Sequence, residues 1–215
     1  MQPSGKLIIN LRGNDKSFVL WNGTESYYKK LRSAYKEVSK ENYSEHLYFG
    51  FFTLCSATLE YSLNFILADF AVKKFGPYKY KDYCDGYINL PLRRKLFMSP
   101  HIISEGNFVI NENHNSFKKL ERLIILRNRI LHNKEFLKEF EIPDLNLEVS
   151  KDGIIVPEEK TEINFEFEIK DNPIDTLNQK ICIEFGNSLG DFKKYIMTPS
   201  INGELMENPM ILKHK

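Results

Sequence analysis

The run from Arg127 to His132 places a fixed cation and a titratable base close together in an otherwise apolar stretch of sequence. Apolar residues recur at helical spacing across residues 116–138, and Arg127 lies at the centre of the face that they form. An arginine is costly there unless it has a partner or a function. His132 lies near the expected end of this helix at Asn133, and Asn128 lies one turn before His132 on the same side. A cation that holds a phosphate beside an imidazole that moves protons is the minimum equipment for cutting RNA without a metal.

A second, more apolar helix, expected from about Ser44 to Lys74, carries an anomaly of its own. Its polar side chains fall on one narrow stripe of the helical wheel: Thr53, Ser56, Glu60 and Asn64. Glu60 is the only charged side chain between His46 and Asp69, and burying it alone would cost several kcal/mol. We therefore expect Glu60 to lie beside Arg127, which has the same problem with the opposite sign. A purely structural ion pair would explain both residues equally well.

These two segments resemble a known protein family. The spacing Arg127-Asn128-x-x-x-His132 resembles the signature of the HEPN superfamily, in which an arginine, usually followed by a polar residue, precedes a histidine by four intervening positions. The segment 59–64 is similar to the family's second typical segment, which commonly has an acidic residue and an asparagine. The resemblance covers about residues 25–138 and extends to the last helix.

The resemblance implies a helical bundle that dimerises and brings two copies of the motif to one cleft. Many members of the family cut RNA without a metal or cofactor, in toxin–antitoxin or phage-defence settings, and others are catalytically silent and bind nucleotides or partner proteins. Carried over to this chain, the catalytic residues are Arg127, His132 and Asn128, with Glu60 and Asn64 in support. RNA and a second copy of the chain are the expected partners, with an antitoxin or another regulatory protein as a further one.

The chemistry of the residues fits the catalytic members of that family. His132 would take the proton of a ribose 2′-hydroxyl or protonate the leaving 5′-oxygen, because imidazole changes charge near neutral pH. Arg127 would hold the phosphate and stabilise the extra negative charge of the transition state. Asn128 would orient His132 or bind the substrate, and Arg129 would contact a flanking phosphate. The expected products are a 2′,3′-cyclic phosphate and a 5′-hydroxyl.

Further RNA contacts are expected between the two helices. The basic run Arg93, Arg94 and Lys95 is a candidate for the RNA backbone, although such runs are also common on solvated surfaces. Four tyrosines offer rings for stacking unpaired bases or for half-buried packing: Tyr78, Tyr80, Tyr83 and Tyr87.

The distribution of charge is more informative than its total, which is +1 over 215 residues. Residues 91–138 hold ten Lys and Arg against four Asp and Glu, whereas residues 139–175 hold three against twelve. This pattern indicates a polyanion site with an acidic flank, two surfaces that contact each other, or simply two solvated faces of opposite sign.

Composition and cysteine content favour a reduced, cytoplasmic protein. Three cysteines form neither a disulfide framework nor a metal-binding spacing, and the amino terminus lacks the apolar run of a signal peptide. The stretch from Leu47 to Ala68 is long enough to span a membrane, but Glu60 near its middle favours a buried core helix.

The remaining pattern predicts one mainly helical domain over 1–215 with a small β appendage. We expect a hairpin over 6–11 and 17–21, a helix from Glu25 to Lys40 capped by Thr24, and largely irregular chain over 77–115 with a short helix over 91–98. The core helices fall at about 25–138 and 173–197.

The β insertion is expected over about 144–170. Alternation predicts strands near 145–149 and 163–169 with a turn at 151–153. The last helix should begin at Pro173, be weakened or bent by Gly186 and Gly190, and leave a loose tail over 198–215.

Overall fold

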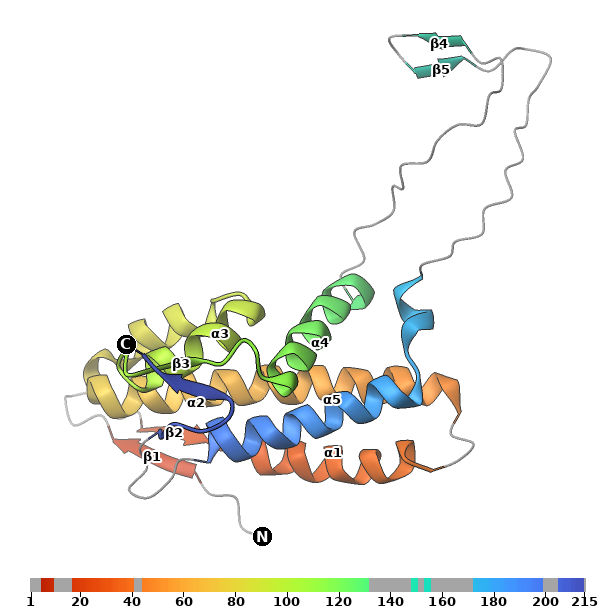
Figure 1. Cartoon of the computed structure of the whole chain (residues 1–215). Coiled ribbons are helices and arrows are strands. Elements are labelled where there is room, and N and C mark those ends of the chain that lie inside the picture. Colours follow the sequence, from red (N-terminus) through yellow and green to blue (C-terminus); the bar gives the residue numbers. More distant parts are fainter. Residues whose placement is uncertain are drawn as a thin grey trace.

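The computed structural model describes residues 5–9, 17–40, 44–131, 148–150, 153–155, 172–198 and 205–214. The fold is mainly helical with small two-stranded antiparallel sheets, as the sequence predicts (Figure 1). The α-helices are α1 (Thr24–Val38), α2 (Glu45–Ile88), α3 (Leu92–Ile103), α4 (Asn115–Leu131) and α5 (Gln179–Phe192).

One apolar core runs between these helices. Helix α2 packs against α1, α3, α4 and α5, and α4 lies along α5. The largest side chains that are wholly removed from water come from α2, α3, α4 and α5: Phe52, Phe117, Phe185, Phe192, Leu59, Leu63, Leu67, Leu96, Leu120, Leu123, Ile124 and Leu189. Gly186 allows α1 and α5 to approach closely, because a Cβ there would lie 2.6 Å from the ring of Tyr35. Gly186 therefore lies inside α5 and permits its close packing against α1.

Helix α2 is longer than the sequence predicts. It continues to Ile88 through a kink at Gly76, whose φ of +68° and ψ of −175° are not helical. The predicted irregular region 77–115 is consequently wrong for most of its length, since it holds the end of α2, all of α3 and strand β3 (Phe108–Ile110). The expected helix end before Gly76-Pro77 coincides with this non-helical residue, and a second helical segment follows directly, with Pro77 tolerated in its first turn.

At the amino end, the predicted hairpin is confirmed. Strands β1 (Gly5–Ile9) and β2 (Ser17–Trp21) pair antiparallel, with Gly5 opposite Trp21. The predicted cap at Thr24 is wrong, because Thr24 is the first helical residue and Gly23 is the N-cap. The α1 N-cap makes no side-chain capping hydrogen bond, and the Gly23 N–H instead donates to the Tyr61 hydroxyl of α2 at 2.9 Å.

The insertion between α4 and α5 contains strands β4 (Glu148–Ser150) and β5 (Gly153–Ile155), which pair antiparallel around the predicted turn. The predicted strand over 163–169 and the expected end of the motif helix at Asn133 lie outside the described residues.

The carboxyl-terminal part differs from the prediction in two ways. Pro173 begins a short 3₁₀ helix, η1 (Pro173–Thr176), and α5 begins separately after Asn178, whose side chain accepts a hydrogen bond from the Ile181 N–H at 3.0 Å. Helix α5 continues into a π-helical turn, η2 (Lys193–Met197). The predicted loose tail is wrong for residues 205–214, because β6 (Ile211–Lys213) pairs antiparallel with β3 and buries Met210 and Ile211 completely.

By length and composition, one helix of the described chain could cross a membrane, namely the His46–Gly76 part of α2. More than half of its most apolar stretch is buried inside the bundle. The core helix of a soluble protein has the same composition, so this stretch is weak evidence for a membrane.

Candidate functional site

The predicted contact between Glu60 and Arg127 is confirmed. The Arg127 Nη2 atom donates to Glu60 Oε2 at 2.9 Å, joining α4 to α2. The Arg127 side chain is 19% exposed and the Glu60 side chain is 39% exposed, so the pair lies at the margin of the core and remains partly hydrated. Arg127 reaches this position because it follows the buried Leu123 and Ile124 by one helical turn on the same face of α4.

Asn64, the other predicted supporting residue, binds Lys95, which the sequence analysis assigned to the RNA backbone. The Lys95 Nζ atom of α3 donates to Asn64 Oδ1 at 2.7 Å, and Lys95 is only 4% exposed. Its prediction as a surface RNA-binding residue is wrong. Lys95 falls on the buried face of α3, between Leu92 and Ser99, and that helical period is the signal that could have revealed it.

Electrostatics connect Lys95 to the ion pair. Removal from water lowers the pKa of Lys95, the Glu60 carboxylate opposes this shift, and the Arg127 cation adds to it. We call Glu60, Asn64, Lys95 and Arg127 the Arg127 cluster. It brings three helices together and holds two cations against one carboxylate, an excess of one positive charge.

The other residues of the motif have different surroundings. Asn128 is exposed and its Oδ1 accepts a hydrogen bond from Arg127 Nη1 at 3.3 Å, so it is tied to the guanidinium. Arg129 is exposed on the last turn of α4. His132 lies outside the described residues, directly after Leu131, the last residue of α4.

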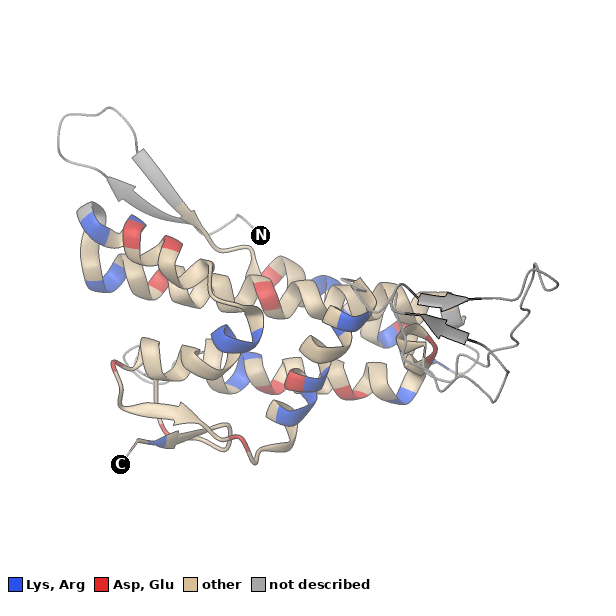
Figure 2. Ribbon diagram, turned by 90° about the horizontal axis from the view of Figure 1, so that it is seen from above, with Lys and Arg blue, Asp and Glu red and all other residues tan. Residues whose placement is uncertain are grey.

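The basic region 91–138 is partly neutralised inside the fold. Arg93 donates two hydrogen bonds to Glu121 of α4, at 2.8 and 2.6 Å, and Lys119 pairs with Glu184 of α5. Arg94 is exposed. Figure 2 accordingly shows both signs of charge spread over the helices in that view. The Arg127 cluster is therefore distinguished by its buried lysine and not by a large basic surface.

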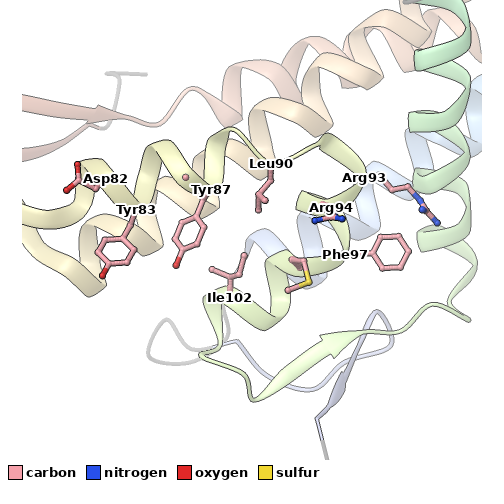
Figure 3. A pocket seen from close by; sticks show the side chains of 10 residues that line it. Asp82, Tyr83, Tyr87, Leu90, Arg93, Arg94, Phe97 and Ile102 are labelled. Atoms are coloured by element: carbon pink, nitrogen blue, oxygen red, sulfur yellow. The ribbon is translucent and has the colours of Figure 1, made fainter.

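Two of the predicted tyrosines, Tyr83 and Tyr87, pack against other aromatic rings and not against this cluster. Tyr83 stacks on Phe75 with ring centroids 3.6 Å apart, and Tyr87 lies 6.3 Å from Phe70 in a tilted arrangement. Tyr83 and Tyr87 also line a pocket of about 650 Å³ between the end of α2 and α3, together with Arg94 (Figure 3). The side chain of Tyr78 lies outside the described residues.

Within the described part of the chain, no three His, Cys, Asp or Glu side chains converge in the manner of a metal site. Comparisons with protein-family models, with curated proteins and with solved structures found no match to this chain.

Proposed function

We propose that this protein is a metal-independent endoribonuclease of the HEPN type. It acts in the cytoplasm as a homodimer, in a toxin–antitoxin or phage-defence setting, and its substrate is RNA. The 2′-oxygen of a ribose attacks the adjacent phosphorus, the bond to the 5′-oxygen breaks, and the products are a 2′,3′-cyclic phosphate and a 5′-hydroxyl.

The excess positive charge of the Arg127 cluster carries this proposal. Water cannot fully solvate Lys95, and Glu60 balances only one of the two cations. A phosphate beside Arg127 would supply the missing negative charge, so the cluster favours an anionic substrate at the end of α4. The histidine of the motif follows one residue after that end.

The residues then take distinct roles. Arg127 holds the phosphate and stabilises the charge that develops on its oxygens. Glu60 and Asn128 fix the orientation of the guanidinium through the two hydrogen bonds at 2.9 and 3.3 Å. Lys95 is buried and hydrogen-bonded to Asn64, and its charge adds positive electrostatic potential around Arg127. His132 moves the protons, and a second copy contributed by a dimer partner would let two histidines share the acid and base steps.

A catalytically silent module that binds a nucleotide or a partner protein is the second candidate. One observation favours it: the Arg127 guanidinium already donates to both Glu60 and Asn128, so fewer of its N–H groups remain for a phosphate. In that case the cluster would bind an anion without cleaving it, or serve as a structural ion pair.

Cleavage of RNA by purified protein in the presence of EDTA separates the two functions. Wild type, Arg127→Ala and His132→Ala are compared on several single-stranded RNAs, after thermal melts have shown that each protein is folded at the assay temperature. The matched controls are Lys118→Ala, an exposed cation on the same helix, and His46→Ala, an exposed histidine at the start of α2. We expect wild type and both controls to yield ends that carry cyclic phosphate, and Arg127→Ala and His132→Ala to lose activity.

Two other results would contradict the proposal. Equal cleavage by all five proteins would assign the activity to a contaminant or to another site. No cleavage of any RNA by a folded wild-type protein would favour the silent binding module.

A further inference from the structure

The pocket between the end of α2 and α3 lies apart from the Arg127 cluster and has its own chemistry. It holds about 650 Å³, within the range of about 300–1,000 Å³ typical of small-molecule sites. Its lining includes Tyr83, Gly86 and Tyr87 from the end of α2 and Arg94 and Met98 from α3. Its wall is mostly apolar, yet the chain leaves Tyr83 and Met98 each more than two-fifths exposed there.

Two residues of opposite charge, Asp82 and Arg94, line this pocket. Figure 3 shows Tyr83 and Tyr87 on the Asp82 side of the pocket and Arg94 on the other side, with the Asp82 carboxylate directed away from the tyrosine rings. Within the described part of the chain, neither Asp82 nor Arg94 has an ion pair or a hydrogen bond from its side chain. Arg93, by contrast, is engaged by Glu121 and lies 5.1 Å from the centre of the Phe97 ring. Arg94 is therefore the cation that the pocket offers to a ligand.

The aromatic wall is held in place by packing. Tyr83 stacks on Phe75 with an angle of 6° between the ring planes, and Phe70 packs against Tyr87. Burial, and to a smaller extent the neighbouring Tyr83, raise the pKa of Tyr87, so its hydroxyl remains a hydrogen-bond donor well above neutral pH. Fixed rings bind a planar ligand with little loss of side-chain entropy.

We infer that this pocket binds a nucleotide, with its base against Tyr83 and Tyr87 and its phosphate at Arg94. Arg94 provides the fork of donors that phosphate prefers, and the tyrosines provide a platform for a base. The tyrosines distinguish this ligand from a fatty acid, because a base can stack on their rings and bond to their hydroxyls. An acyl chain could pair its carboxylate with Arg94 but would leave the tyrosine hydroxyls without a partner.

A nucleotide can come from two sources: a free mononucleotide, or an unpaired residue of an RNA strand. Both present the same base, ribose and phosphate to the pocket. The inference goes beyond the proposed ribonuclease, since it concerns different residues and needs no cleavage. Nucleotide binding at this pocket can therefore be confirmed or refuted independently of the catalytic roles proposed for Arg127 and His132.

Isothermal titration calorimetry with the full chain tests the inference. The ligands are the four nucleoside 5′-monophosphates, the four matching nucleosides, inorganic phosphate, decanoate, and a single-stranded pentanucleotide whose 2′-hydroxyls are methylated so that it cannot be cleaved. We expect at least one monophosphate to bind, and its nucleoside and inorganic phosphate to bind about tenfold more weakly or worse, since each lacks one half of the contacts.

Two pairs of variants locate the binding. Arg94→Ala should weaken it about tenfold, whereas Arg32→Ala, an exposed arginine of α1, should leave it unchanged. Gly86→Leu fills the pocket, because a Cβ at Gly86 meets nothing within 4 Å, and should abolish binding. Gly50→Leu adds the same side chain to equally open space elsewhere on α2 and should bind as wild type does. Both glycine variants should fold, since leucine is a better helix former than glycine.

The outcomes separate the sources and the failures. Monophosphates that bind more tightly than the pentanucleotide would identify a free nucleotide as the ligand. A pentanucleotide that binds more tightly, with the same dependence on Arg94 and Gly86, would identify an unpaired RNA residue. The inference is overturned if no nucleotide binds, if Arg94→Ala and Gly86→Leu both bind normally, or if decanoate binds at this pocket in place of nucleotides.

Discussion

Two of the ion pairs that join helix α4 to its neighbours, one near its start and one near its end, differ in the charge that they leave uncompensated. Near its start, Lys119 pairs with Glu184 of α5, and each side chain is 25% exposed. Near its end, Arg127 pairs with Glu60 of α2, but the buried Lys95 adds a second cation that binds only a neutral amide oxygen.

The difference lies in which cations water can reach. Lys180 and Arg122 also act on Glu184, but both are exposed and hydrated, so they need no further anion. Lys95 is buried, so water cannot stabilise its charge in this way. Two contacts that look alike as ion pairs therefore differ in net charge: the first is balanced by exposed cations in water, and the second retains the excess positive charge on which the proposed phosphate binding rests.

The largest expected effect concerns RNA binding. Arg127→Met should weaken binding of a 2′-O-methylated RNA about tenfold, or about 1.4 kcal/mol, because it removes a charge-assisted contact with phosphate. Lys119→Met, which removes the cation of the ion pair with Glu184 near the start of the same helix, should change binding less than about twofold. Fluorescence anisotropy at low and moderate salt measures both. Equal losses for the two variants would reduce the comparison to general charge.

The sequence could predict the ion pair at the end of α4 but not the whole cluster. Glu60 and Arg127 were detectable because each is an isolated charge on an apolar helical face. Lys95 was grouped with its sequence neighbours Arg93 and Arg94, although the helical period places it on the opposite, buried side of α3. A charged residue on an apolar face is informative only once the helix itself has been recognised.

Much of the fold was predictable for a related reason. Strong periodicity identified α1, α4 and most of α2, whereas local breaker residues gave misleading boundaries. Helical structure resumes directly after the non-helical Gly76, and Pro173 begins a separate 3₁₀ turn. The pairing of β6 with β3 joins segments about 100 residues apart in sequence, and a short strand carries no signal of so distant a partner.

The second prediction changes the balance of charge in the cluster. Glu60→Gln should lower the free energy of unfolding by about 1 kcal/mol, since the pair is partly hydrated and its loss leaves two uncompensated cations. The same variant should gain more stability from added sulfate than wild type does, because an anion that binds only the folded state stabilises it. Thermal melts with and without sulfate measure both effects.

Glu184→Gln is the matched control for that experiment. It breaks the ion pair at the start of α4 and should show no greater stabilisation by sulfate than wild type. If Glu60→Gln and Glu184→Gln respond to sulfate equally, the excess charge of the Arg127 cluster has no consequence for anions.

The smallest effect is the pH dependence of the ion pair at the start of α4. The hydrogen bond from Lys119 lowers the pKa of Glu184, and burial opposes this shift in part. A carboxyl whose pKa is lower in the folded state stabilises the protein above the unfolded value of about 4.3, and this contribution is lost as pH falls through the folded value. Wild type should therefore exceed Glu184→Gln in unfolding free energy by less than about 1 kcal/mol at pH 7, and the difference should vanish in acid. Urea denaturation at pH 7, 5 and 3.5 measures it, and a difference independent of pH would show that packing, not charge, makes this contact.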